Sequence, residues 1–181
     1  MIGGLAMDAP RRASPRDDRL ADLFRAESAH AVNLAFLLTG QRQLAEDIAQ
    51  EAFVRIAGRL RDVSPDAFPA YLQRTVVNLV RSHFRHTEVR RRHAERIRVA
   101  AEQQRAASEA ASVADGVDER LWAALAALPD RQREAIVCRF YLDMSEQQTA
   151  DTLGVRVGTV KSATSRGLQT LRAALDSEEV S

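Results

Sequence analysis

One run near the end of the chain, residues 142–175, constrains the fold more than any other part of the sequence. It reads LDMSEQQTADTLGVRVGTVKSATSRGLQTLRAAL. Ser145 and Gln148 have the spacing of a capping box, in which each side chain bonds a backbone amide at the start of a helix. Gly154 follows where the chain has to turn sharply, with a positive φ if needed. The run therefore predicts a short helix, a turn, and a second helix that begins near Val157.

Three further positions specify how these two helices cross. Ala150 is small where the helices touch, Gly154 lies at the turn, and Val160 is a branched apolar residue that anchors the second helix. This spacing is typical of a helix-turn-helix. The apolar positions of the second helix recur with helical spacing and should face the core; they are Val160, Thr164, Leu168, Leu171 and Leu175. The opposite face carries Ser162, Ser165, Arg166 and Gln169, flanked by Lys161 and Arg172. No acidic residue occurs between Asp151 and Asp176, so this face suits a DNA major groove.

Composition limits the alternatives. The 181 residues are 45% hydrophobic and 28% charged, which is ordinary for one globular domain or two small ones. The net charge is only +1, so any basic footprint must be local. Cys138 is the only cysteine, which excludes an internal disulfide and a cysteine-based zinc site, and we expect it in the core. No apolar run is long enough for a membrane span or a signal peptide, so we expect a cytoplasmic protein without membrane insertion.

The first half of the chain predicts helices with contrasting surfaces. Residues 1–16 have no periodicity and are predicted to be a mobile tail. A first helix should start near Asp17 or Asp18, with a possible break at residues 27–29, and end at Gly40. A second helix should run from about Arg42 to Leu60. Its polar face carries Glu46, Asp47, Gln50, Glu51 and Arg55, and periodicity alone predicts that this acidic face is solvated.

A loop over residues 61–69 should precede a third helix that runs to about His86. Its outer side is basic and carries Arg74, Asn78, Arg81 and Arg85. The aromatic residues Phe68, Tyr71 and Phe84 alternate with these arginines. Aromatic stacking combined with phosphate contacts is what single-stranded DNA binding requires, although aromatic residues at this spacing are more often part of a core.

The second half is predicted to be a separate helical domain. Residues 87–116 are basic and then rich in alanine, and we interpret them as a linker. His83, His86 and His93 have no matching carboxylate or thiol, so no metal is expected. From residue 117 to 176 a helix stripe, Leu121, Trp122, Leu125 and Leu128, ends at Pro129. Asp130 should cap the next helix, whose apolar residues are Ile136, Val137, Phe140 and Tyr141. Residues 177–181 form an acidic tail. No strand pattern occurs, so the chain is predicted to be all-α, with two small helical domains.

Two blocks of the sequence resemble one family. The segment LAFLLTGQRQLAEDIAQEAFVRIAGRL is similar to region two of bacterial sigma factors, above all in Thr39-Gly40 and in residues 45–53. The segment AALAALPDRQREAIVCRFYLDMSEQQTADTLGVRVGTVKSATSRGLQTLR resembles region four, with Leu128-Pro129, Arg133 and residues 158–162 matching well. The short gap between the blocks is typical of the extracytoplasmic-function (ECF) class. The resemblance covers roughly residues 18–175.

The resemblance implies a role for each surface in promoter recognition by RNA polymerase. The second helix would dock on the polymerase clamp through Asp47, Gln50, Glu51 and Phe53. Residues 17–86 would open the −10 element and hold its single strand through Asp62, Ser64, Phe68, Tyr71, Arg74, Asn78, Arg81 and Arg85. Residues 117–176 would bind the −35 element through Arg156, Thr159, Lys161, Ser162, Ser165, Arg166 and Gln169, and would contact the polymerase flap. An anti-sigma factor is an expected partner. The chain itself would catalyse nothing and would need no cofactor and no small-molecule substrate.

Two other functions fit parts of the sequence. A conventional repressor or activator would bind operator DNA as a dimer through the same helix-turn-helix, at half-sites one helical turn apart. An enzyme such as a histidine-dependent nuclease has only the three histidines in its favour. The ECF sigma factor remains the leading hypothesis because both blocks occur in the family's order.

Overall fold

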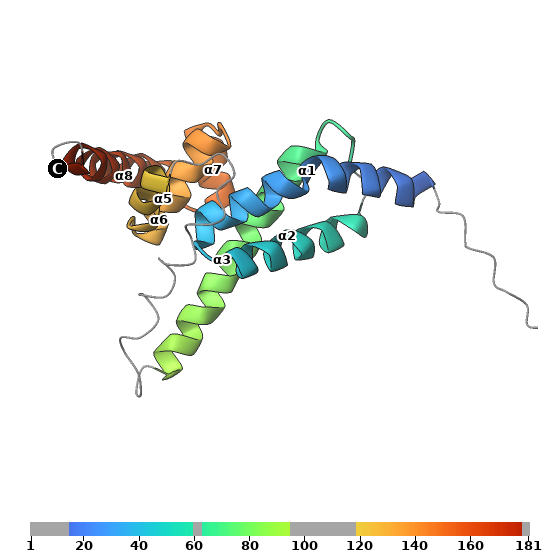
Figure 1. Cartoon of the computed structure of the whole chain (residues 1–181), viewed down its shortest axis with the longest axis horizontal. Coiled ribbons are helices and arrows are strands. Elements are labelled where there is room, and N and C mark those ends of the chain that lie inside the picture. Colours follow the sequence, from blue (N-terminus) through green and yellow to red (C-terminus); the bar gives the residue numbers. More distant parts are fainter. Residues whose placement is uncertain (1–14, 60–62, 95–118, 179–181) are drawn as a thin grey trace, which may run out of the picture.

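The computed structural model describes residues 15–59, 63–94 and 119–178, and within these ranges it contains helices and no strand (Figure 1). The all-α prediction is confirmed for this part of the chain. The elements in chain order are α1 (Pro15–Thr39), α2 (Arg42–Ala57), α3 (Phe68–Ala94), α5 (Glu119–Ala126), α6 (Asp130–Ile136), the π-helix η2 (Val137–Tyr141), α7 (Glu146–Leu153) and α8 (Val157–Glu178). Of the predicted tail 1–16, residues 1–14 lie outside the described residues, whereas residues 15 and 16 belong to α1, which begins earlier than predicted. Asp62 and linker residues 95–116 also lie outside the described residues, whereas residues 87–94 of the predicted linker continue α3. None of the described helices is long and apolar enough to cross a membrane.

The first helix is continuous, so the predicted break at residues 27–29 is wrong. This stretch contains no Gly or Pro. The later turns of α1 pack on α2 and α3, and this packing outweighs the modest helix propensity of Ser28 and His30. The helix ends as predicted at Gly40, which adopts a left-handed conformation with φ of 73°. Its N–H donates to the carbonyl oxygen of Phe36 at 2.8 Å, satisfying one of the free carbonyl groups of the last turn.

The helices α1, α2 and α3 pack together as the N-terminal bundle. Its fully buried side chains come from all three helices and include Leu34, Ile56, Phe68, Val76 and Val80. The second helix ends at Ala57, three residues before the predicted end. The third helix continues to Ala94 instead of ending near His86, because residues 87–94 contain no helix-breaking residue.

The remaining elements form the C-terminal domain, in which α8 packs across α6, α7 and α5. Asp130 does not cap α6 from outside as predicted; it is the first helical residue, after Pro129, and its carboxylate binds Arg133 at 2.7 Å. Phe140 and Tyr141 are not core residues as predicted, because their side chains are 58% and 37% exposed. The chain widens here into a π-helix, with the Leu142 N–H bonded to the carbonyl of Val137 at 3.1 Å. A π-turn shifts the residues after it around the helix axis, so a 3.6-residue period fails.

The N-terminal bundle and the C-terminal domain touch directly. The C-terminal end of α1 approaches α5, α6 and η2, and α3 approaches α7 (Figure 1). Cys138 is fully buried, as predicted, and belongs to a hydrophobic cluster with members from both halves of the chain.

Candidate nucleic-acid interface and docking face

The helix-turn-helix forms as the sequence predicts. Ser145 is the N-cap of α7: its hydroxyl accepts from the Gln148 N–H at 3.1 Å, and the Gln148 side chain accepts from the Ser145 N–H at 2.7 Å. Gly154 ends α7 in the left-handed region, with φ of 56°, where a residue with a Cβ is strained. Ala150 and Val160 are both buried where α7 and α8 cross. These local features fix the angle at which α8 is presented.

The polar face of α8 lies at the surface. Six of the seven residues predicted for −35 DNA binding are exposed, namely Arg156, Thr159, Lys161, Ser165, Arg166 and Gln169. The seventh, Ser162, is half-buried. The hydroxyl of Ser162 donates to the carbonyl of Thr159 at 3.1 Å, and the Lys161 ammonium lies 3.4 Å from the Glu146 carboxylate of α7. The polar atoms of this face are available to a partner, with Lys161 already beside an acidic group.

Gly167 is a residue that periodicity did not single out, although it sets how closely α8 approaches α6. It is buried in the middle of α8, and a Cβ there would lie 3.0 Å from Cγ1 of Ile136. The sequence signal that could have identified Gly167 is its place in the middle of a long amphipathic helix. Glycine lowers helix stability there, so its presence indicates a packing requirement.

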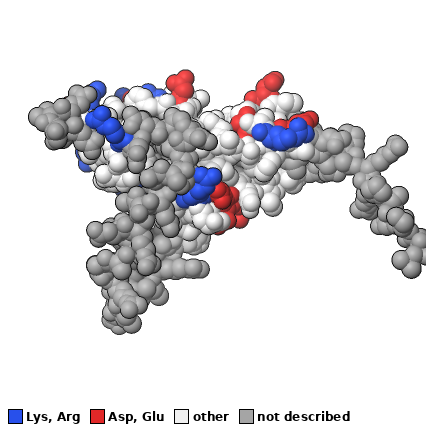
Figure 2. All heavy atoms as spheres, viewed as in Figure 1, with Lys and Arg blue, Asp and Glu red and all other residues white. Residues whose placement is uncertain are grey.

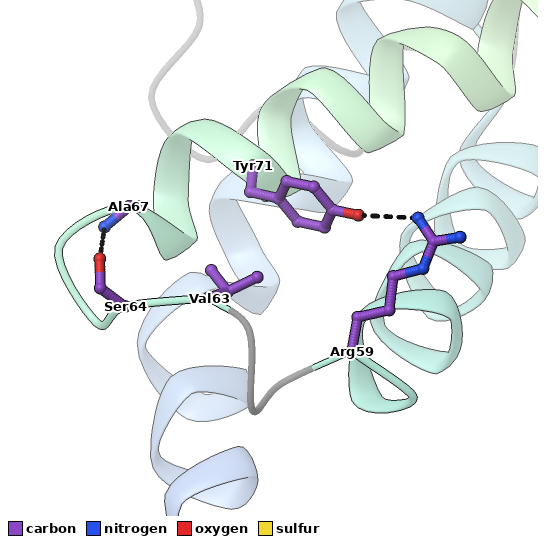
Figure 3. Close-up of a pocket in the computed structure, with 5 residues that line it drawn as sticks. All are labelled: Arg59, Val63, Ser64, Ala67 and Tyr71. Carbon is purple, nitrogen blue, oxygen red and sulfur yellow. Dashed lines mark hydrogen bonds between the residues drawn. The ribbon is translucent and has the colours of Figure 1, made fainter.

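A pocket lies at the N-terminal end of α3 (Figure 3). It has a volume of about 390 Å³ and is lined by Arg59, Val63, Ser64, Ala67 and Tyr71. The Arg59 guanidinium lies across the pocket from Tyr71 and donates to the phenol oxygen at 3.4 Å. Such a volume is in the range of clefts that bind small molecules, roughly 300–1,000 Å³. A tyrosine ring and a guanidinium plane are also the groups on which nucleobases stack.

The loop that forms this pocket is held by local bonds. The Ala67 N–H donates to the hydroxyl of Ser64 at 3.3 Å, and the Phe68 N–H donates to the Pro65 carbonyl at 3.2 Å. Phe68 is fully buried, so it anchors α3 in the core and does not present its ring to the surface. Tyr71 is half-buried on the pocket side. Arg59 was not among the residues predicted from sequence, because it follows the end of α2 and joins the pocket only through the fold.

The basic side of α3 continues from this pocket along the helix. Arg74, Asn78 and Arg85 are exposed. Arg81 differs, because its side chain is only 26% exposed and is turned toward the C-terminal domain. The structure therefore groups Ser64, Tyr71, Arg74 and Asn78 on one surface and places Arg81 at a contact between the two halves.

The polar face of α2 carries acidic groups that are partly neutralised. Glu46 and Glu51 form ion pairs one turn apart with Arg42 at 2.7 Å and Arg55 at 2.8 Å. Such exposed pairs contribute only about 0.3–0.5 kcal/mol each. The Asp47 carboxylate is also exposed, and the Gln43 side chain donates to it at 3.5 Å. This face is acidic and open to solvent, as the sequence predicts.

Phe53 of α2, to which the resemblance assigns a role in docking on the polymerase, does not lie at the surface. Phe53 is only 5% exposed and packs against Phe24, with 4.7 Å between the ring centroids. Val54, which the sequence did not single out, is 74% exposed beside Gln50 and Glu51. An apolar groove of about 600 Å³ adjoins it, between the first turns of α1 and the end of α2, lined by Phe24, Phe53 and Val54 among others. An exposed apolar site with a polar rim is typical of a protein-binding surface.

Charge is distributed in small groups. On the face that Figure 2 shows, Lys and Arg side chains occur in separate groups, some of them beside acidic side chains. This distribution agrees with the net charge of +1. Within the described ranges there is no group of three or more His, Cys, Asp and Glu residues that could hold a metal ion.

Comparison with known proteins agrees with this architecture. The family model for sigma-70 region 2 matches residues 23–91, and the model for sigma-70 region 4 matches residues 118–171. The ECF RNA polymerase sigma factor SigE of Mycolicibacterium smegmatis is 33% identical over 159 residues, covering 83% of this chain and 59% of that protein. The ECF RNA polymerase sigma factor EcfG of Rhodopseudomonas palustris is 31% identical over 162 residues, covering 89% of this chain and 87% of that protein.

Solved structures share the fold. The sigma factor RpoE of Bartonella quintana, in complex with the anti-sigma factor NepR, aligns with a TM-score of 0.66 at 20% identity, covering 88% of this chain and 98% of that chain. CnrH, in complex with the cytosolic domain of CnrY, aligns with a TM-score of 0.54 at 24% identity, covering 88% of this chain and 89% of that chain.

The fold and the matched regions thus define a sigma-70-type protein with regions two and four. The chain belongs to the ECF class of RNA polymerase sigma factors, as its similarity to EcfG over most of both proteins shows.

Proposed function

We propose that this chain directs RNA polymerase to promoters by holding the −10 element on its N-terminal bundle and the −35 element on its C-terminal helix-turn-helix. The observation that carries the proposal is the pairing of two different nucleic-acid surfaces in one chain. The pocket between Arg59 and Tyr71 suits an unstacked base, whereas the polar face of α8 suits a duplex groove. A conventional repressor needs only the second of these surfaces.

The −10 surface would work by capturing a base that has left the duplex. Extruding a base costs a few kcal/mol of lost stacking, which contacts in the pocket must offset. Stacking on Tyr71 and Arg59 supplies part of that free energy, at about 1–3 kcal/mol per stacked base. Arg74 and Arg85, exposed further along α3, would hold the phosphates of the same strand.

The acidic face of α2 would dock on the clamp of core polymerase. Asp47, Gln50 and Glu51 provide exposed polar groups, and Val54 supplies the apolar contact at the position next to the buried Phe53. The C-terminal domain would contact the polymerase flap. The chain contributes specificity, and the polymerase carries out the chemistry in the cytoplasm. A protein partner of the anti-sigma kind would inhibit it by covering these docking faces.

The test is reconstituted transcription. Core polymerase with the purified chain should start transcripts at discrete sites on genomic DNA, and those sites should share two sequence elements that core polymerase alone ignores. Asp47→Arg should weaken capture of core polymerase at least tenfold, since it reverses a charge at the centre of the docking face. The matched control is Asp176→Arg, an equal charge change at an exposed position on α8. Absence of initiation, together with tight binding of the isolated protein to a palindromic duplex, would instead indicate a conventional regulator.

A further inference from the structure

A carboxylate lies beside the polar face of the recognition helix. Oε2 of Glu146, on α7, is 3.4 Å from Nζ of Lys161, on α8. The side chains of the lysine and the glutamate are 62% and 43% exposed, so both charges are in contact with solvent. Lys161 is the only lysine of the chain and belongs to the surface proposed for the −35 duplex. The pair therefore places a negative charge where duplex binding uses a positive one.

Local structure fixes the positions of both partners. The capping box of Ser145 and Gln148 makes Glu146 the first residue of α7. Lys161 lies in the second turn of α8, which begins at Val157. The left-handed Gly154 ends α7, and the buried contact between the two helices sets their angle. The fold of the helix-turn-helix, and not the approach of two mobile segments, brings the two charges together.

Glu146 also has a purely structural explanation. A carboxylate in the first turn of a helix interacts favourably with the helix dipole and with the unpaired N–H groups of that turn. This effect stabilises α7 whether or not a lysine is nearby. It predicts that removal of the carboxylate lowers the stability of the domain, and it predicts no change in DNA binding. The two explanations can therefore be separated by experiment.

The other carboxylates of the helix-turn-helix are placed differently. No acidic residue occurs in α8 before Asp176, close to its end. Asp151 of α7 is five residues after Glu146, which places it about 140° further around the helix axis. Its carboxylate accepts from the Gln147 side chain at 3.0 Å. Of the two carboxylates on α7, the one on Glu146 thus lies against a cation of α8.

A DNA phosphate and the Glu146 carboxylate are alternative partners for the same ammonium group. Lysine binds phosphate as a compact point charge. If the ammonium must first leave a carboxylate, one ion pair replaces another and the net gain from the phosphate contact falls. Phosphate contacts supply the sequence-independent part of the affinity. Competition at Lys161 would therefore weaken this part and leave the base contacts of α8 with a larger share of the total.

We propose that Glu146 is an affinity-setting residue of the helix-turn-helix, whose carboxylate competes with a DNA phosphate for Lys161 and lowers the affinity of the chain for duplex DNA of any sequence. The inference rests on the proposed function, because it places α8 on duplex DNA. Removal of the carboxylate frees the lysine without changing the number of phosphates contacted, so the salt slope stays the same. Exposed ion pairs change an equilibrium constant by at most about fivefold, so the expected effect is a few-fold.

A double-mutant cycle tests the competition. The four chains are the wild type, Glu146→Gln, Lys161→Ala and the combination of both, each bound to core polymerase. Filter binding measures their affinity for two duplexes, namely a promoter mapped with the wild-type chain and the same duplex with its −35 segment scrambled. The matched control is Asp151→Asn, which removes one carboxylate from the same helix but leaves the pair with Lys161 intact. Thermal unfolding of each free chain measures its stability.

Glu146→Gln should raise the affinity for both duplexes by about threefold, and Asp151→Asn should leave it unchanged. In the Lys161→Ala chain, Glu146→Gln should change the affinity by less than about 1.5-fold, because no lysine remains to be released. An equal gain with and without Lys161 would indicate general charge repulsion and would overturn the competition.

Three other outcomes would also contradict the proposal. A lower Tm of Glu146→Gln with unchanged affinity would show that the residue acts on stability alone. A change confined to the mapped promoter would show that Glu146 reads a base. Either result leaves the proposed function intact. A wild-type complex that binds neither duplex more tightly than core polymerase alone would overturn the proposed function, and this inference with it.

Discussion

The guanidinium of Arg133 donates to the carbonyl of Leu38 across 95 positions of sequence, and also to the carbonyls of Ala126 and Leu128 in its own domain. One buried side chain therefore satisfies the ends of two helices, α1 and α5, and pairs with Asp130. The planar fork of arginine suits this task because its donors point in several fixed directions.

Arg133→Lys should lower the free energy of unfolding by about 1–3 kcal/mol, because lysine cannot reach all four acceptors and leaves buried carbonyls unsatisfied. Urea unfolding followed by circular dichroism measures this loss as a lower midpoint. Arg131→Lys is the control, since Arg131 is exposed on the same helix and should change the midpoint little. Equal midpoints for the two variants would contradict the role of Arg133.

Gly167→Ala should destabilise the protein by about 1 kcal/mol, although alanine is the better helix former. Overpacking against the buried Ile136, whose Cγ1 would be 3.0 Å from the new Cβ, outweighs the gain in propensity. Gly158→Ala is the matched control on the same helix, because no atom lies within 4 Å of its added Cβ. Thermal unfolding should show a lower Tm for the first variant and an equal or higher Tm for the second. The opposite order would mean that Ile136 moves aside freely.

Lys161→Ala should reduce the salt dependence of promoter binding by the polymerase complex. If Lys161 neutralises one phosphate, the slope of log K against log[salt] falls by about one. Glu146→Gln is the control, because it removes only the carboxylate 3.4 Å from the lysine and leaves the phosphate contact in place. Filter binding across a range of salt concentrations measures both slopes. An unchanged slope in the alanine variant would place Lys161 away from the DNA.

Cys138 should be unreactive in the folded protein. Burial raises its pKa from 9.0 to about 12, so almost no thiolate is present at pH 8. A thiol reagent such as dithionitrobenzoate should label one thiol per chain in denaturant and none in buffer. Because the folded pKa lies above the unfolded one, the contribution of this group to stability is complete below pH 9 and is lost as the pH rises toward 12. Cys138→Ala should remove that part of the alkaline loss of stability. Rapid labelling in buffer would show that the core opens locally.

The N-terminal and C-terminal helices could be predicted from sequence because their signals are local. The Ser145–Gln148 capping box and the positive φ of Gly154 depend on residues that are neighbours along the chain. Helical periodicity likewise identified Val160 and Leu171 on the buried face of α8. The end of α3 was misplaced by eight residues, since nothing local marks it.

Errors arose where geometry departed from the regular helix or where distant segments met. The π-turn after Ile136 moved Phe140 and Tyr141 out of the core. The pocket lined by Arg59 and Tyr71 joins the end of one helix to the start of another, so no period reveals it.

The sequence by itself determined an all-α chain with a helix-turn-helix near its end, because capping, turn formation and amphipathic spacing act over a few residues. Only the tertiary structure decided that Arg81 faces Glu134 and Thr152 and that Arg133 caps α1. Those contacts join residues tens of positions apart. Other arginines of this chain also lie on the polar faces of helices, so the local sequence does not mark Arg81 and Arg133. Which arginine contacts the other half depends on how the two halves pack, and helical periodicity carries no information about that packing.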